Sequence, residues 1–409
     1  MTTSLSRRSL LGRLLAGATG ALATMAFGRH DMPLQGAMPA VPPDPTKVPG
    51  GPTSVLGARS AFESPERILF ATASKTPLQD LHGTVTPSDL HYERHHAGVP
   101  AIDPERYTLL VHGMVERPTV FTLADLKRFP AVTRTHFLEC SGNFTPNAPE
   151  NITPQELCGM TSQTEWTGVP LATLFREIGA DPAATWFLAE GEDAAVLARS
   201  IPVSKAWDDA MIAYAQNGEA LRPCNGYPAR LLLPGWEGNT NVKWLRRIEL
   251  ASEPFMTREE TSKYTEALKN GTARQFSFVI DARSIITNPC YPERVQPGWI
   301  EFRGLAWSGR GRIATVDVSV DEGATWQRAT LETPVQTKAH TRFRYLWRWD
   351  GREATVLSRA TDETGYVQPT VRELVEARGP GAGPYHLNPI TGWRLKPDGR
   401  VLFRTEPWA

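Results

Sequence analysis

The sequence has 409 residues, of which 41% are hydrophobic, and this length predicts two folded domains rather than one core. Lys and Arg together number 44, as do Asp and Glu, so the formal net charge is zero. That balance argues against a protein that binds nucleic acid or a membrane surface through bulk electrostatics. Beyond the N-terminus, no stretch is long and apolar enough to predict a membrane span.

The first thirty residues have the pattern of an export signal. They contain the pair Arg7-Arg8, followed by a moderately apolar stretch from Leu10 to Phe27 that is rich in small residues. This pattern resembles a twin-arginine signal, which exports proteins already folded around a cofactor. A membrane anchor is the alternative, although the apolar run is short for one. We therefore expect a periplasmic protein with a signal peptide at 1–30 and a Pro/Gly-rich leader at 31–64.

Residues 65–255 alternate between two periodicities. Strand-like runs such as RYTLLVHGMV, THFLECSG, TWFLAEGE and ARLLLPGW are separated by helical patterns. Of these, TLADLKRF opens with Thr122, a suitable N-cap, and PLATLFREIGA ends at Gly179, a suitable helix stop. The pattern predicts an α+β protein whose first domain is mixed α/β. The polar residues 256–273 then form a junction.

Residues 274–409 lose the helical period. VDVSVDEGATWQRATL contains two alternating runs around Asp-Glu-Gly, which predicts a hairpin. FRYLWRWDGREATVLSRATDETGY adds two strands around Asp-Gly. Several short strands at this spacing predict an immunoglobulin-like β-sandwich.

The chain has four cysteines, with no CxxC and no CxxCH pattern, so neither a zinc pair nor a covalently attached haem is expected in this chain. Cys140 ends the apolar run HFLEC and is followed by Ser-Gly-Asn. A lone cysteine is most often buried core. Here, however, Gly142 permits close approach to a ligand and Asn143 tolerates turn geometry. A thiolate at such a turn is a soft metal ligand or a nucleophile.

The segment HYERHHAGVP, residues 91–100, places Arg94 among His91, His95 and His96. It lacks the i, i+4 histidine pair of a helical zinc site, and its Gly-Val-Pro ending favours a loop. An arginine with imidazole neighbours suits the binding of anionic oxygens by charge-assisted hydrogen bonds. A solvated loop is the alternative.

The segment GYPARLLLPGWEGNTNVKWLRRIEL, residues 226–250, has a buried strand that enters a Gly-rich loop. Lys243-Trp244 and Arg246-Arg247 then begin the next strand. Such a loop can hold a phosphate with backbone N–H groups while Lys and Arg supply positive charge. Alone this signal is weak, because neither a GxGxxG nor a P-loop pattern is present.

The chain resembles the sulfite oxidase family of molybdenum enzymes, and within it the molybdenum subunits of periplasmic sulfane dehydrogenases. The resemblance rests on ordered segments between about residues 75 and 395: ERHHAGVP, FLECSGN, EWTGVPL, GYPARLLLPGWEGN, VKWLRRIE, LAWSGRGRI, VDVSVDEGATW and DETGYVQP. It implies that Cys140 is the thiolate ligand of a dioxo molybdenum held by molybdopterin. Residues 65–255 would be the molybdopterin-binding domain and residues 274–409 the dimerisation domain.

The resemblance also implies roles for individual residues. Arg94 would face the substrate oxyanion and Tyr264 would lie beside the metal, so these two and Cys140 are the expected catalytic residues. The implied cofactor contacts are Tyr92, Glu93, Arg94, His95, His96, Asp193, Asn225, Arg230, Asn241 and Lys243.

The chain departs from the family pattern where that pattern has cations. The usual Arg-Arg after Cys-x-Gly-Asn is Phe144-Thr145, the usual Gly-Ala-Arg is Gly-Asn-Thr at 238–240, and the usual histidine is Asn225. Sulfite needs several charge-assisted contacts, so a larger substrate such as sulfur on a carrier protein is favoured over free sulfite.

The implied function is a molybdenum-dependent dehydrogenase of sulfur compounds. Its implied partners are a c-type cytochrome subunit, which takes the electrons, and a sulfur-carrier protein or a small sulfur oxyanion as substrate. We expect a homodimer within a hetero-oligomer. The alternatives are a sulfite dehydrogenase, a periplasmic sulfoxide reductase, against which residues 274–409 count, and a binding module in which Cys140 is only core.

Overall fold

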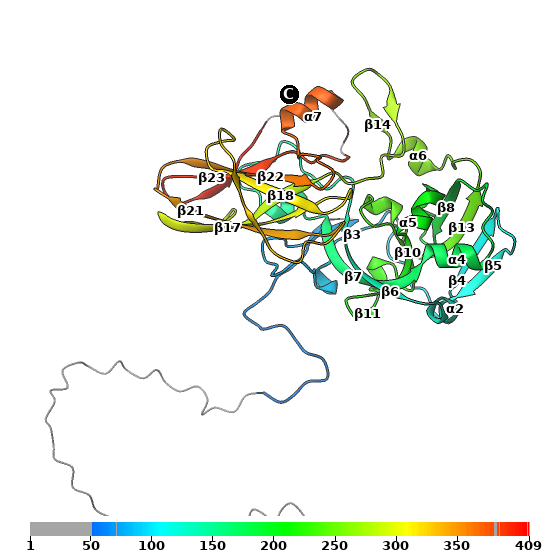
Figure 1. Ribbon diagram of the computed structural model, residues 1–409. Helices are drawn as coiled ribbons and strands as arrows, with labels where there is room; N and C mark the ends of the chain where they lie inside the picture. The colour runs from blue at the N-terminus through cyan, green and yellow to red at the C-terminus, as the bar shows by residue number, and fades with distance from the viewer. Residues whose placement is uncertain (1–50, 71, 380–382, 384, 407, 409) are drawn as a thin grey trace, which may run out of the picture. The chain divides into compact units, whose positions relative to one another are not determined.

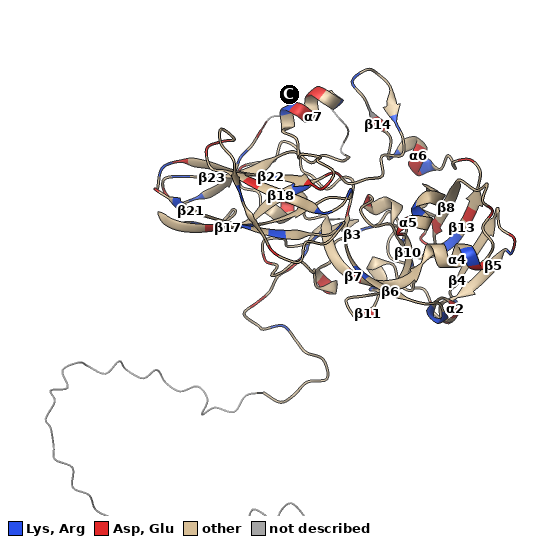
Figure 2. Ribbon diagram, viewed as in Figure 1, with Lys and Arg blue, Asp and Glu red and all other residues tan. Residues whose placement is uncertain are grey.

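The computed structural model describes residues 51–70, 72–379, 383, 385–406 and 408. The expected signal peptide at 1–30 and the first part of the leader therefore lie outside the described residues. The chain divides into residues 1–59 and 60–409, and all the described helices and strands lie in the second unit. No helix of the described ranges is long and apolar enough to cross a membrane. Basic and acidic residues are interspersed over this unit (Figure 2).

The first half of the unit contains a five-stranded sheet that forms one core. Its central strand β13 runs parallel to β4 and antiparallel to β8. Apolar side chains from these strands and from the helices α2 (Leu123–Arg128) and α4 (Leu171–Glu177) fill the core. The order of the sheet is β5 (Thr119–Thr122), β4 (Thr108–Gly113), β13 (Leu245–Ala251), β8 (Trp186–Gly191) and β9 (Ala198–Pro202).

A second sheet contains the strand that leads to Cys140. The long antiparallel pair β6–β7 forms one side of it, and β6 ends at Glu139, one residue before the cysteine. Its order is β11 (Glu219–Ala220), β10 (Met211–Gln216), β7 (Thr161–Pro170) and β6 (Val132–Glu139), with β12 (Arg230–Leu232) also paired to β10. The predicted strand in ARLLLP is therefore confirmed as β12, and all three residues of β12 are buried.

A small third sheet corrects the prediction of a loop at residues 91–100. It consists of β1 (Ile68–Phe70), β2 (Ala73–Lys75) and β3 (Glu93–Arg94). Arg94 pairs with Ala73 and Glu93 with Ser74, so this part of the predicted loop is a short strand. The reason is a partner about twenty residues away, which no local pattern could reveal.

Short helices connect these strands. The predicted cap is confirmed, because the Thr122 side chain accepts from the Asp125 N–H at the start of α2. Gly179, at φ +67°, follows the end of α4, as predicted. The helices of this half are α2 (Leu123–Arg128), α3 (Pro154–Cys158), α4 (Leu171–Glu177), α5 (Val203–Asp208) and α6 (Arg258–Ser262), with one-turn 3₁₀ helices η2 (Ser88–Leu90), η3 (Pro223–Asn225) and η4 (Gly238–Thr240). The expected junction contains α6 and the hairpin of β14 (Glu266–Ala267) and β15 (Ala273–Arg274).

The second half is the predicted β-sandwich. One sheet has the order β16 (Arg283–Asn288), β17 (Gly298–Trp307), β21 (Thr341–Trp349) and β20 (Thr330–Leu331). The other has the order β19 (Gln327–Arg328), β18 (Ile313–Ser319), β22 (Ala354–Asp362), β23 (Thr391–Leu395) and β24 (Val401–Phe403), and helix α7 (Val371–Arg378) follows β22.

The two strand pairs predicted from sequence in this domain have different connections. The hairpin around Asp-Glu-Gly is confirmed as β18 and β19. The strands around Asp-Gly are β21 and β22, but they belong to different sheets, so that link crosses the sandwich.

The two halves share a core. Phe137 of β6 and Leu157 of α3 pack in the same apolar cluster as Trp307 and Phe343 of the sandwich. Figure 1 shows β17, β21 and β23 at one end of the unit and β4, β5 and β13 at the other, with β3 and β7 between them. The turn after β6 therefore lies where the two halves meet.

Candidate active site

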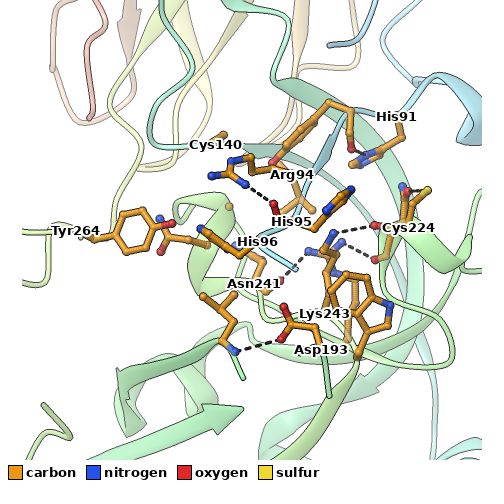
Figure 3. Close-up of a pocket in the computed structure, with 18 residues that line it drawn as sticks. His91, Arg94, His95, His96, Cys140, Asp193, Cys224, Asn241, Lys243 and Tyr264 are labelled. Atoms are coloured by element: carbon orange, nitrogen blue, oxygen red, sulfur yellow. Dashed lines mark hydrogen bonds between the residues drawn. The ribbon is translucent and has the colours of Figure 1, made fainter. Parts of the chain in front are cut away.

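A single pocket gathers nearly all the residues predicted from sequence. It encloses about 680 Å³ of space, part of it open to solvent, and Figure 3 shows its lining. Every expected catalytic or cofactor residue except Glu93 lines it. The lining consists of His91, Tyr92, Arg94, His95, His96, Leu138, Cys140, Asp193, Leu197, Cys224, Asn225, Arg230, Gly238, Asn239, Asn241, Lys243, Trp244 and Tyr264.

Cys140 sits on a tightly bonded turn. Its N–H donates to the Met160 carbonyl at 3.0 Å, and its carbonyl accepts from the Asn143 N–H at 2.9 Å. Burial raises the pKa of the Cys140 thiol to about 11, while the Gly142 N–H and the charge of Arg94 act in the opposite direction. A metal that binds this sulfur would displace its proton, because thiolate is the ligand form.

The short strand β3 brings Arg94 beside Cys140. The guanidinium donates from Nη1 to the Thr72 hydroxyl at 3.2 Å and to the His95 carbonyl, and no other described contact engages it. Glu93 points elsewhere and pairs with Arg67, with His95 3.8 Å away. The structure thus places Arg94 in the pocket and Glu93 in its supporting layer.

Several buried polar atoms of the pocket lack a hydrogen-bond partner among the described residues. They are His91 Nε2, His95 Nδ1, Asn225 Nδ2 and Asn239 Oδ1. Buried polar groups in folded proteins are nearly always paired, so four such atoms around one pocket indicate a polar ligand. Burial lowers the pKa of His91 to about 3, so its imidazole is neutral. Its Nδ1 donates to the Tyr92 carbonyl at 2.9 Å, which leaves Nε2 as an acceptor for a ligand.

Two buried or half-buried cations, Arg230 and Lys243, also line the pocket. Arg230 is 3% exposed and donates to the carbonyls of Asn225 and Asn241, both at 2.8 Å. Lys243 Nζ donates to the Cys224 carbonyl at 2.8 Å. Burial, with the charge of Arg230, lowers the pKa of Lys243 to about 7. A bound phosphate would offset that loss of solvation and raise the pKa again.

The arginines of β13 do not reach the pocket, although the sequence indicated that they could supply charge to the loop. Arg246 and Arg247 pair with the two oxygens of Glu190 at 2.8 and 2.6 Å. Asn241 and Asp193 line the pocket but also brace it. The Asn241 side chain accepts from the Leu233 N–H at 2.6 Å, and Asp193 accepts from the Leu197 N–H at 3.1 Å.

Tyr264 lies on the Cys140 side of the pocket. Its ring stands 4.9 Å from the Arg199 guanidinium and 5.2 Å from the ring of Tyr385. Burial raises the pKa of the Tyr264 phenol, and the Cys140 charge raises it further. Tyr264 therefore remains a hydrogen-bond donor at neutral pH.

Sequence reasoning missed part of the lining and its support. Cys224, Asn239 and Trp244 line the pocket. Behind it, Arg199 pairs with Glu237 at 3.1 Å and with Glu260 at 2.6 Å, all nearly inaccessible to solvent. Arg199 and Glu260 lie in stretches without a motif, so only the fold could reveal this cluster.

The donor set fits a metal carried by an organic cofactor. Within the part of the chain that the structure describes, no group of three or more His, Cys, Asp or Glu is placed to hold a metal ion. Cys140 offers one sulfur, while the unpartnered atoms of His91, His95 and Asn225 offer contacts to a polar organic group. Lys243 and Arg230 offer charge to a phosphate.

Comparison with known proteins gives the family. Residues 96–259 match the oxidoreductase molybdopterin binding domain, and residues 274–392 match the Mo-co oxidoreductase dimerisation domain. The chain is 32% identical over 345 residues to the NADH nitrate reductase of Solanum lycopersicum, a match that covers 72% of this chain and 37% of that protein. It is 30% identical over 334 residues to the mitochondrial sulfite oxidase of Rattus norvegicus, which covers 74% of this chain and 60% of that one.

The chain thus spans less than two thirds of the length of these two curated relatives. By contrast, it covers 99% of a chain in the crystal structure of the sulfane dehydrogenase SoxCD from Paracoccus pantotrophus. That match covers 89% of this chain at 41% identity with a TM-score of 0.83. The chain belongs to the sulfite oxidase family of molybdopterin oxidoreductases.

Proposed function

We propose that this chain is the molybdenum subunit of a periplasmic dehydrogenase that oxidises sulfane sulfur bound to a carrier protein and passes the electrons to a c-type cytochrome. The observation that carries the proposal is that Cys140, Arg94 and Tyr264 line one pocket together with the cations Arg230 and Lys243. The similarity to a sulfane dehydrogenase supports it.

The residues present fit molybdenum with molybdopterin, which we propose to be in the dioxo form. Cys140 Sγ would ligate the metal, and the two unpartnered histidines, His91 and His95, would contact the pterin. Arg230 and Lys243 would hold its phosphate. When bound, this cofactor supplies an oxygen atom to sulfur and accepts two electrons, and water replaces the oxygen.

The chain's own residues would orient the substrate. Arg94 has donors beyond Nη1 that no described contact engages, so it can bind the oxygen that acquires charge on sulfur. Tyr264 stays protonated and can donate to the same oxygen. Each oxygen taken from water releases two protons, which must leave through the open side of the pocket.

The scarcity of cations near Cys140 favours a substrate other than free sulfite. The ring of Phe144 is tilted against that of Trp408, with centroids 5.8 Å apart, and Thr145 donates to the Glu156 carbonyl at 3.0 Å. Thr240 is buried and donates to the Glu237 carbonyl at 2.7 Å. None of these positions, where the family has arginines, brings positive charge to the pocket. A dianion would therefore be held weakly, whereas sulfur on a protein gains contacts outside the pocket.

Features of the sequence support the proposed cellular location, oligomeric state and cytochrome partner. The twin-arginine pattern in residues 1–30 supports export of the folded protein to the periplasm. The match of residues 274–392 to a dimerisation domain supports a homodimer, within a hetero-oligomer that includes the cytochrome. The chain has no CxxCH pattern, so the haem would belong to that partner.

The test is a comparison of substrates with the complete holoenzyme and its cytochrome. We expect a protein-bound persulfide to reduce the cytochrome with a kcat/KM at least about tenfold above that of sulfite, a difference of about 1.4 kcal/mol. A faster reaction with sulfite would support the sulfite dehydrogenase alternative, which Arg94 and the similarity to sulfite oxidase favour. Reduction of sulfoxides by a reduced dye, with no oxidation of either sulfur substrate, would indicate a reductase.

A further inference from the structure

Glu139, the residue directly before Cys140, is held by the second domain. It is 2% exposed, and its carboxylate accepts from three donors. Arg283 of β16 donates from Nη1 at 2.6 Å, Trp307 of β17 donates from Nε1 at 2.6 Å, and Asn143 donates from Nδ2 at 3.0 Å. Two of these three donors come from the sandwich domain.

Arg283 binds both ends of the cysteine turn. The same Nη1 that pairs with Glu139 also donates to the Asn143 carbonyl at 2.7 Å. Nη2 donates to the Leu387 carbonyl, which belongs to the second domain. One buried guanidinium therefore links residues 139 and 143, on either side of Cys140, to a segment of the sandwich.

The second domain also contacts the middle of the cysteine turn. The Ser141 carbonyl accepts from the His386 N–H at 2.8 Å. A small pocket lies against the turn, and its lining includes Cys140, Ser141 and Arg283.

We propose that Arg283 is a positioning residue for Cys140, so that the sandwich domain forms part of the active site in addition to its dimerisation role. Arg283 does not line the main pocket and would not touch the cofactor. It acts by fixing the backbone on both sides of Cys140, which sets the direction of the sulfur. The inference rests on the proposed role of Cys140 as a metal ligand.

The test compares Arg283→Gln with Arg342→Gln. Arg342 also reaches from the sandwich to the first half, where it donates to the carbonyls of Gly83 at 2.8 Å and Leu81 at 3.2 Å, but it makes no contact with the cysteine turn. Both variants are made in full-length protein in a Cys224→Ser background, because Cys224 is the other partly exposed thiol. The readouts are molybdenum per chain, the electron paramagnetic resonance spectrum of the half-reduced holoenzyme, and the alkylation rate of Cys140 in full-length protein from a host without molybdopterin.

We expect Arg283→Gln to raise the alkylation rate about tenfold, the effect of losing one or two hydrogen bonds that order the turn, and to change the resonance spectrum. Arg342→Gln should lower the thermal midpoint about as much as Arg283→Gln does. It should change neither the alkylation rate nor the resonance spectrum. If the two variants have the same alkylation rate and spectrum, the proposal is overturned. If Arg283→Gln does not fold, Arg283→Lys, which keeps the charge but not the forked geometry, must show the same direction of change.

Failure of the proposed function would look different. Full molybdenum content in Cys140→Ala protein would refute the ligand role, while the alkylation comparison would still report whether Arg283 orders the turn.

Discussion

Gly238 lies against the backbone of Cys140. A Cβ built at position 238 would stand 3.4 Å from the Cys140 Cα, 3.0 Å from the Glu139 carbonyl oxygen and 2.7 Å from the Tyr92 hydroxyl. The residues Glu139 and Glu237 form a parallel bridge that brings these two segments together. A side chain at 238 would therefore push directly on the turn that carries the expected metal ligand.

Gly238→Ala should disturb both folding and cofactor content. Overpacking of this kind costs about 1–3 kcal/mol, and the displaced turn should hold less molybdenum. Urea unfolding and molybdenum per chain measure the two effects. Gly57→Ala is the control, because no atom lies within 4 Å of a Cβ at that position. Equal molybdenum in both variants would show that the contact with Cys140 is unimportant.

Lys243→Met should reduce cofactor retention, because we propose that Lys243 holds the cofactor's phosphate. Losing a charge-assisted hydrogen bond of about 1.5–3 kcal/mol should weaken binding at least about tenfold. The control is Lys205→Met. Lys205 is buried and, like Lys243, donates to a carbonyl, that of Pro234 at 2.8 Å, but it does not line the pocket. Molybdenum per chain after extensive dialysis should fall only in the first variant. Equal loss in both would assign the effect to general destabilisation.

The stability of the protein should rise with pH because of Lys205. Burial lowers its pKa to about 8 in the folded protein, from an ordinary value of 10.5. The folded state therefore disfavours the protonated amine. This lowers the free energy of unfolding by the full amount below about pH 8, and the loss disappears as the pH rises to about 10.5. The difference corresponds to at most about 3 kcal/mol. The free energy of unfolding of the wild type, minus that of Lys205→Met, should increase across this range. A flat difference would contradict the burial argument.

Arg94→Met should impair catalysis without loss of the cofactor. Removing a donor aimed at developing charge typically costs a factor of about 10² to 10³ in rate. Arg67→Met is the matched control, because Arg67 supports the same segment through the His91 carbonyl at 3.1 Å and Glu93 but does not line the pocket. Cytochrome reduction should fall steeply only in the Arg94 variant. A comparable fall in both would give Arg94 a structural role.

The sequence predicted features that depend on neighbours along the chain. The Thr122 cap, the strand that delivers Cys140 and the hairpin of β18 and β19 all follow from patterns of fewer than twenty residues. The resemblance added the pocket residues, which lie far apart in sequence and which the fold brings together.

Long-range relationships could not be predicted in this way. Arg283 and Glu139 are 144 residues apart, and neither lies in a motif that indicates an ion pair. The strand at Glu93–Arg94 exists because β2 pairs with it, and its own two residues carry no strand signal. The crossing between β21 and β22 likewise depends on which sheet each strand joins, not on its turn residues.

The most direct test of Cys140 as the molybdenum ligand is molybdenum per chain in Cys140→Ala, beside Cys224→Ala, with both proteins exported from a molybdopterin-competent host. Both cysteines are partly exposed and line the same pocket, so the pair isolates the role of one sulfur. We predict about one molybdenum per chain in the wild type and in Cys224→Ala, and a collapse in Cys140→Ala. Undiminished molybdenum in Cys140→Ala, or none in the wild type, would contradict this prediction.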